Sequence, residues 1–178
     1  MKYAGIGSRN TPDQQRSRMA DIAAGLAKQG WLLRSGAAPG ADTAFEWGCD
    51  QVDGAKEIYL PWNNFARHSN GMTITPEQWE AAEYLASLFH PAWDKCSPAA
   101  RQLHARNGFQ ILGPDLNDPV DMVICWTPDG KMVGGTSQAM RIAQHFQIPI
   151  LNLAMLSDNA FMETYERLVV KPMLEKKG

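Results

Sequence analysis

Three glycine-containing turns carry residues that could bind a phosphate group. Residues 5–9, 35–42 and 134–136 each follow a run typical of a β-strand and precede a run typical of a helix. Glycine lets the backbone approach a ligand closely, and the free N–H groups at a helix N-terminus attract anions. In a parallel sheet such turns meet at one edge. The spacing therefore predicts a pocket for a nucleotide phosphate, and it indicates the class of ligand more firmly than the reaction.

The side chains of the first and third turns suit the same chemistry. In the first turn Gly7 permits close approach, Ser8 offers a hydroxyl and Arg9 offers a bidentate donor to phosphate oxygens. In the third turn Thr136 is a predicted N-cap whose hydroxyl and neighbouring amides suit phosphate. The alternatives are a tight turn with a surface arginine, and a turn that only caps a helix.

The second turn adds a pair of carboxylates. Asp42 and Glu46 are four residues apart, so a helix over residues 41–52 places them on one face. A carboxylate at such a helix start could hydrogen-bond a ribose hydroxyl, or stabilise an oxocarbenium-like state during N-glycosidic cleavage. Asp42 and Glu46 are therefore the candidate catalytic residues if the protein is an enzyme. The alternatives are a plain N-cap for Asp42 and a solvated helix face for Glu46.

Arg106 and Asn107 complete the candidate site from a predicted helix that precedes the fourth strand. Asn107 could hydrogen-bond a base or a ribose, and Arg106 could close over a phosphate. The alternative is that both lie at the surface. The predicted ligand-binding residues are Gly7, Ser8, Arg9, Ser35, Gly36, Gly40, Ala41, Asp42, Arg106, Asn107, Gly134, Gly135 and Thr136.

These turns need a sheet to position them, and the chain alternates between strand-like and helix-like runs. The strand-like runs cover residues 2–6, 31–35, 57–60, 120–126 and 148–153. The helix-like runs, two of which have Thr11 and Thr75 as predicted N-caps, cover residues 12–29, 41–52, 75–90, 97–111, 136–146 and 159–175. This alternation predicts a single α/β domain over residues 1–178, Rossmann-like and doubly wound, with a mostly parallel sheet of about five strands. Residues 61–106 are predicted to form a helical insertion between strands three and four, over the edge of the sheet.

Composition and charge narrow the class of protein. A net charge of -2 argues against a broad nucleic-acid-binding surface, although it leaves room for a local basic strip. The three cysteines lack C-x-x-C spacing and the four histidines lack H-E-x-x-H spacing, so neither a disulfide framework nor a metal centre is predicted. No cofactor is predicted either. The N-terminal residues lack a signal-peptide core, and no apolar run reaches the roughly 18 residues of a membrane span. A cytoplasmic protein without a membrane partner is expected.

In their order along the chain, these motifs resemble the SLOG superfamily, which unites DNA-processing protein A with the Lonely Guy nucleotide phosphoribohydrolases. Within it, the chain is most similar to the small stand-alone YspA-type proteins. The likeness covers about residues 2–153 and rests on Gly7-Ser8-Arg9, Ser35-Gly36, Gly40-Ala41-Asp42, residues 44–47, Arg106-Asn107, Gly135-Thr136, residues 141–143 and Ile148-Pro149. The resemblance implies a nucleotide-derived ligand at the carboxyl ends of the parallel strands, and a homo-oligomer.

The chain departs from the Lonely Guy pattern at the third turn. Those enzymes carry Pro-Gly-Gly-x-Gly-Thr followed by a catalytic glutamate, whereas residues 133–139 here read VGGTSQA and contain no acid. We therefore expect a module that binds a nucleotide or a nucleotide-derived small molecule without turnover, as a sensor or a sequestering protein does. A nucleoside-phosphate N-glycosidase or phosphoribohydrolase is the alternative. A DNA-processing accessory protein is a weaker alternative, because the chain lacks the basic excess that nucleic acid favours.

Overall fold

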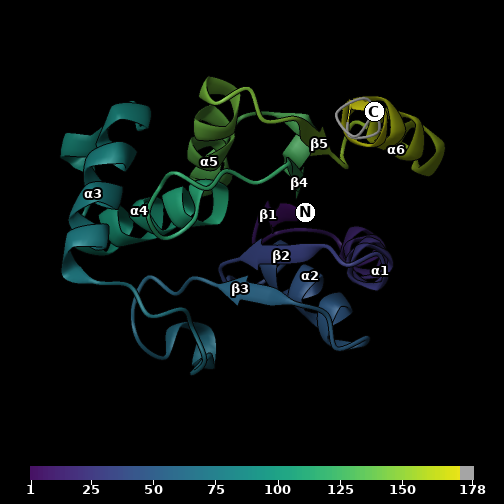
Figure 1. Cartoon of the computed structure of the whole chain (residues 1–178). Helices are drawn as coiled ribbons and strands as arrows, with labels where there is room; N and C mark the ends of the chain where they lie inside the picture. The colour runs from purple at the N-terminus through teal and green to yellow at the C-terminus, as the bar shows by residue number, and fades with distance from the viewer. Residues whose placement is uncertain (173–178) are drawn as a thin grey trace.

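The computed structural model describes residues 1–172 and contains a five-stranded sheet between two layers of helices (Figure 1). Every neighbouring pair of strands is parallel. The strands, in their order across the sheet, are β3 (Lys56–Ile58), β2 (Leu32–Ser35), β1 (Lys2–Gly7), β4 (Met122–Trp126) and β5 (Ile150–Asn152). The predicted Rossmann-like α/β fold is confirmed. The strand order reverses at β1 and β4, which makes the space beyond their carboxyl ends the expected ligand crevice.

The helices alternate with the strands as predicted. They are α1 (Asp13–Lys28), α2 (Ala41–Asp50), α3 (Pro76–Phe89), α4 (Pro98–Leu112), α5 (Gly134–His145) and α6 (Asp158–Tyr165), with α6 running into a π-helical turn at Glu166–Val170. The end of the predicted last helix, from residue 173 to residue 175, lies outside the described residues. None of the described helices is long and apolar enough to cross a membrane.

Side chains of β1 alternate between two apolar cores, one on each face of the sheet. Tyr3 packs in a core with Met19 of α1 and Phe45 of α2, whereas Ala4 and Ile6 pack in a second core on the opposite face. The two-residue period of a strand produces this division. The first core is covered by α1, α2 and α6, and the second by α4 and α5.

The segment between β3 and β4 departs from the prediction in its position. The capping box at the start of α3 is confirmed, since the Thr75 hydroxyl accepts the Gln78 N–H at 3.2 Å and the Gln78 side chain accepts the Thr75 N–H at 2.9 Å. However, Ile111 and Leu112 of α4 are fully buried in the core beneath β1. The predicted helical insertion between β3 and β4 is confirmed, but the end of α4, beyond the predicted bound at residue 106, packs on the face of the sheet and not over its edge. The chain must cross from β3, at one edge, past β2 and β1 to reach β4, and such a crossover lies on the face of the sheet.

Two predicted helix caps are also wrong. The Thr11 hydroxyl donates to the carbonyl oxygen of Ser8 at 2.6 Å, and Pro12 is the N-cap of α1 without a side-chain cap. Thr136 lies inside the first turn of α5, because that helix begins two residues earlier at Gly134. The Thr11 hydroxyl thus bonds within the preceding turn and does not cap α1. Thr136 does not cap α5 because the helix begins before it.

Candidate functional site

A cleft of about 910 Å³ lies at the carboxyl ends of β1 and β4. Its walls come from the turn after β1, from one face of α4 and from the start of α5. Helices α4 and α5 lie side by side (Figure 1). This is the point at which the strand order reverses, where open α/β sheets bind their ligands. The predicted residues that line the cleft are Gly7, Ser8, Arg9, Asp42, Arg106, Asn107, Gly134, Gly135 and Thr136.

The glycines of the second turn, Gly36 and Gly40, do not line the cleft, although Ala38 and Asp42 of that turn do. The carbonyl oxygen of Gly36 accepts a hydrogen bond from Arg106 Nη1, and a Cβ at Gly36 would overlap that guanidinium. Gly40 has a φ of +94°, and a Cβ there would lie 2.6 Å from the carbonyl oxygen of Ser8. These two glycines therefore let the second turn pack around Arg106 and against the first turn.

Three other predicted residues fix β1 to its neighbours. A Cβ at Gly7 would lie 2.7 Å from Ala41 Cβ and 2.8 Å from the Trp126 carbonyl oxygen. The Ser35 hydroxyl is fully buried and donates to the Gly5 carbonyl oxygen at 2.7 Å. Ser35 and Ala41 do not line the cleft, so their contribution is to hold β1, β2 and α2 in position.

Arg106 and Asp42 form a buried ion pair at the base of the cleft. The Asp42 Oδ2 atom lies 3.4 Å from Arg106 Nη1 and accepts the Ala38 N–H at 3.4 Å. Their exposed fractions are 3% for Asp42 and 6% for Arg106, so neither is a surface residue. Burial raises the pKa of the Asp42 carboxyl, and the facing guanidinium offsets part of that rise. The pair holds a guanidinium rigidly at the cleft wall.

The start of α5 presents backbone N–H groups to the cleft. In residues 1–172, no side chain caps this helix, so the amides of its first turn at Gly134, Gly135 and Thr136 have no capping acceptor. A Cβ at Gly135 would meet no atom of the described chain within 4 Å. Asn107 supports this turn from α4, because its Nδ2 donates to the Gly135 carbonyl oxygen at 3.2 Å. Uncapped amides at a helix N-terminus can receive an anion.

By contrast, the N-terminus of α2 is occupied by its own chain. The Ala41 N–H donates to the Ser8 carbonyl oxygen at 3.3 Å, and the Thr43 N–H donates to the Ala38 carbonyl oxygen at 3.2 Å. These amides are therefore not available to a ligand. The three turns predicted that several helix N-termini would face one ligand. Of these, the N-terminus of α5 is the one that presents uncapped amides to the cleft.

Positive charge dominates the cleft. Arg9, Arg106 and Arg141 line it, and Asp42 is the carboxylate among its described lining residues. Arg9 is exposed and makes no ion pair within residues 1–172, while Arg141 Nη1 donates to the Ser137 hydroxyl at 3.3 Å. Because Asp42 offsets only one of the three guanidinium charges, the cleft favours an anionic ligand.

Glu46 does not line the cleft. Its Oε1 atom accepts from Lys56 Nζ at 2.8 Å and lies 2.7 Å from His68 Nε2, and its exposed fraction is 7%. One helical turn advances about 5.4 Å, which takes Glu46 away from the cleft that Asp42 reaches. The shared helix face of the two carboxylates therefore does not bring both to one ligand.

Sequence reasoning missed His90, His104, Gln110 and Arg141 as lining residues. Burial, with smaller effects from His90 and Arg106, lowers the pKa of His104 to about 4, so its imidazole is neutral at pH 7. A signal for two of them was present, since His104, Asn107 and Gln110 recur at three-residue spacing on α4. Residues at this spacing share a helix face.

Comparisons with known proteins bear on the fold. No family model matches the chain, and no curated protein matches its sequence. Among solved structures, DNA processing protein A from Helicobacter pylori, described for its single-stranded DNA binding mode, aligns with a TM-score of 0.51 and 16% identity over 94% of this chain and 72% of that chain. DNA processing protein A from Streptococcus pneumoniae aligns with a TM-score of 0.52 and 19% identity over 93% of this chain and 56% of that chain. The chain therefore has a Rossmann-like fold similar to that of DNA processing protein A.

Proposed function

We propose that the cleft binds the phosphate of a nucleotide or a nucleotide-derived small molecule and holds the ligand intact, as a sensor or sequestering module. The observation that carries the proposal is the uncapped start of α5, whose amides at Gly134–Thr136 share one cleft with Arg9 and Arg106. Helix amides and guanidinium groups are both preferred partners of phosphate oxygens. The YspA-type likeness of the motifs supports the same ligand class.

The carboxylates support binding rather than N-glycosidic cleavage. A hydrolase of this kind needs a carboxylate beside the sugar to stabilise the developing positive charge. Asp42 lines the cleft, but it is committed to Arg106 and its pKa is raised by burial. Glu46 is committed to Lys56 and His68 outside the cleft. Hydrolysis therefore remains the alternative, with Asp42 as the carboxylate that it would use.

A second candidate ligand is single-stranded DNA. The observation that favours it is the fold shared with DNA processing protein A from Helicobacter pylori, which is described as binding single-stranded DNA. The arginines of the cleft could contact DNA phosphates as well as a nucleotide. The two ligands differ in salt dependence, because each phosphate that a protein neutralises on a strand adds to the slope of affinity against salt concentration.

The test is a retention experiment with purified protein. The protein is incubated with nucleoside monophosphates, NAD, ADP-ribose, cyclic nucleotides and a short single-stranded oligonucleotide, filtered, denatured and analysed by mass spectrometry. We expect one nucleotide-type member to be retained and recovered intact. Release of a free base would establish the hydrolase. Retention of the oligonucleotide alone, lost steeply with salt, would establish the DNA-binding alternative, and retention of nothing would refute all three.

A matched pair of variants ties retention to the cleft. Arg9→Gln removes a guanidinium from the cleft wall, and Arg16→Gln removes an exposed guanidinium from α1 at a position that does not line the cleft. We expect Arg9→Gln to weaken retention about tenfold, as the loss of one charge-assisted hydrogen bond does. Arg16→Gln should leave retention unchanged. Equal effects of the two substitutions would show that binding depends on overall charge rather than on the cleft.

A further inference from the structure

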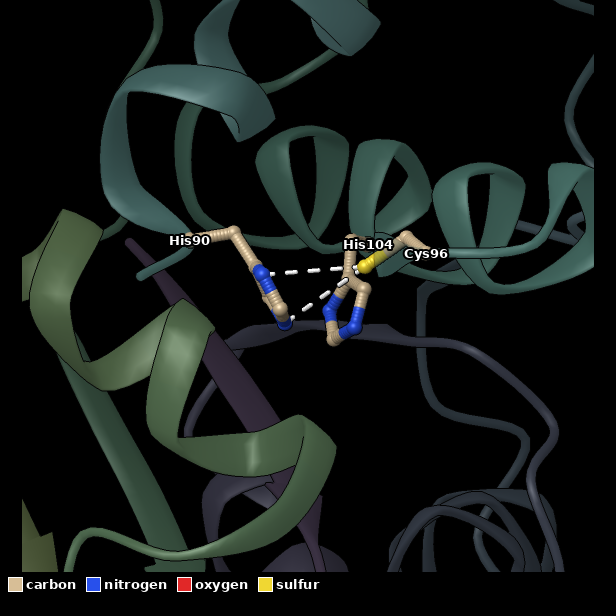
Figure 2. A group of neighbouring side chains, drawn as sticks. All are labelled: His90, Cys96 and His104. Atoms are coloured by element: carbon tan, nitrogen blue, oxygen red, sulfur yellow. Dashed lines mark hydrogen bonds between the residues drawn. The ribbon is translucent and has the colours of Figure 1, made fainter. Parts of the chain in front are cut away.

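Two histidines and a cysteine lie close together at the wall of the cleft. A ring nitrogen of His90, the Cys96 sulfur and a ring nitrogen of His104 all lie within 4.8 Å of one another. Figure 2 shows the two imidazoles and the sulfur side by side, with His90 coming from the end of α3 and His104 from α4. His90 and His104 line the cleft. The three side chains thus form a compact set of nitrogen and sulfur ligands beside the proposed ligand site.

The folding of residues 90–97 creates this cluster. His90 is the C-cap of α3, and a single helical turn at Trp93–Lys95 brings the chain back so that Cys96 Sγ lies 3.6 Å from His90 Nδ1. The Trp93 ring packs against the His90 imidazole with 6.2 Å between ring centroids. The His90 and His104 rings are 4.3 Å apart between centroids. The histidines are therefore held close by packing, not by a charge pair.

The spacing matches a tetrahedral metal site. Bonds of about 2.3 Å to sulfur and about 2.0–2.1 Å to nitrogen place neighbouring ligand atoms about 3.3–3.7 Å apart. The separation of 3.6 Å between Cys96 Sγ and His90 Nδ1 already has this length. All three ligand atoms lie within 4.8 Å of one another, so no separation exceeds the tetrahedral spacing by more than about 1.5 Å, which a rotation of one imidazole can supply.

An ordinary hydrogen bond explains less of the cluster. A thiol is a weak donor, and the contacts of Cys96 Sγ are all long: 3.6 Å to the Ala92 carbonyl oxygen, and 3.6 Å and 3.8 Å to the two ring nitrogens of His90. His104 Nδ1 is buried and has no hydrogen-bond partner among residues 1–172. Buried polar nitrogens are seldom left without a partner. A metal ion would satisfy a nitrogen and the sulfur at once.

We propose that His90, Cys96 and His104 bind a zinc-class divalent metal ion at the wall of the cleft. Neutral imidazole and thiolate are the ligands that zinc prefers, and three protein ligands leave a fourth position open, as in catalytic rather than structural zinc sites. The Cys96 thiol releases its proton to solvent on binding. Coordination through His90 Nδ1 replaces the hydrogen bond that this atom accepts from the Ala92 N–H at 3.2 Å and leaves Nε2 protonated. Because two ligands line the cleft, water or an anionic group in the cleft can take the fourth position.

The test is a metal titration of the purified full chain after removal of bound metal by a chelator, with no nucleotide present. We expect one Co²⁺ per chain, with the absorption of a thiolate-bound tetrahedral ion, and displacement of that ion by Zn²⁺. Cys96→Ser should abolish the thiolate-to-cobalt absorption, and His104→Gln should weaken Zn²⁺ binding by more than tenfold. His145→Gln, an exposed histidine that does not line the cleft, is the matched control and should bind as the original chain does.

Two results would overturn the proposal. One is an original chain that binds neither Co²⁺ nor Zn²⁺ stoichiometrically, and the other is an unchanged cobalt spectrum in Cys96→Ser. Circular dichroism of each variant shows whether it is folded, and Cys96 is only half-buried, so Cys96→Ser is expected to fold. Since the titration uses the metal alone, its failure would leave the proposed nucleotide function standing, and failure of nucleotide retention would leave the metal site standing.

Discussion

Two of the three glycine-rich turns, residues 35–42 and residues 134–136, use their glycines in different ways. In the turn over residues 35–42, the space beside Gly36 and Gly40 is filled by the chain itself, by the Arg106 guanidinium and by carbonyl oxygens of the first turn. In the turn at the start of α5, the space beside Gly134 and Gly135 is open. Glycine therefore allows close packing behind the cleft in one region and leaves room for a ligand in the other.

The polar groups follow the same division. Near residues 35–42, the amides at the start of α2 donate to backbone carbonyls, and Asp42 pairs with Arg106. At the start of α5, the first-turn amides have no capping side chain within the described residues. A glycine motif thus indicates that the backbone can approach other atoms closely. The surrounding atoms determine whether those atoms belong to the chain itself or to a ligand.

The largest effect that sharpens this comparison is expected from Gly40→Ala. The left-handed backbone at this position costs a residue with a side chain about 1–2 kcal/mol, and forcing a Cβ against two carbonyl oxygens adds a similar amount. We expect a loss of about 3 kcal/mol in the free energy of unfolding, measured with urea. The matched control is Gly25→Ala in α1, where a Cβ meets nothing within 4 Å of the described chain and about 0.5–1 kcal/mol should be gained.

Asp42→Asn should have the next largest effect on stability. It leaves the Arg106 guanidinium buried without its carboxylate, and removing one partner of a buried ion pair costs about 3–5 kcal/mol, reduced here because the amide can still accept the Ala38 N–H. We expect a loss of about 2 kcal/mol in the free energy of unfolding, measured with urea. If Arg106→Gln and Asp42→Asn together cost no less than the sum of the two single changes, the pair is not coupled and this account of the cleft wall is wrong.

Gly135→Ala tests the open side of the comparison. Because a Cβ here meets nothing within 4 Å of the described chain, the free energy of unfolding should stay within about 0.5 kcal/mol of the original value. The added methyl group lies at the proposed phosphate site, so retention of the ligand found in the filtration experiment should fall by about tenfold or more. Unchanged retention would mean that no ligand approaches the start of α5.

Much of the fold could be predicted from the sequence, because it depends on local patterns, whereas the division between a packed turn and an open turn could not. The strand and helix runs, the carboxyl-end position of the first and third turns and the capping box at Thr75 all follow from residues close together in the chain. The position of α4 on the sheet depends on strand order, which no local pattern contains. The contact between Arg106 and Gly36 joins residues 70 positions apart.

The same limit explains the histidine and cysteine cluster. His90 directly follows α3, Cys96 lies in the segment between α3 and α4, and His104 lies on α4, so no fixed motif spacing marks the three as ligands. The orientation of Glu46 was equally hidden. The pattern of α2 placed it on the face of Asp42, but Lys56 of β3 and His68 of the following loop decide its contacts.

Glu46→Gln gives the smallest expected effect and separates the two carboxylates of α2. Lys56 is partly exposed, so the lost charge pair should cost only about 1 kcal/mol in the free energy of unfolding. Since Glu46 does not line the cleft, ligand retention should equal that of the original chain. A loss of retention, or of a turnover that the original chain shows, would place Glu46 in contact with the ligand. In that case the start of α2 would also belong to the binding site, and the contrast between a packed turn at residues 35–42 and a binding turn at α5 would be wrong.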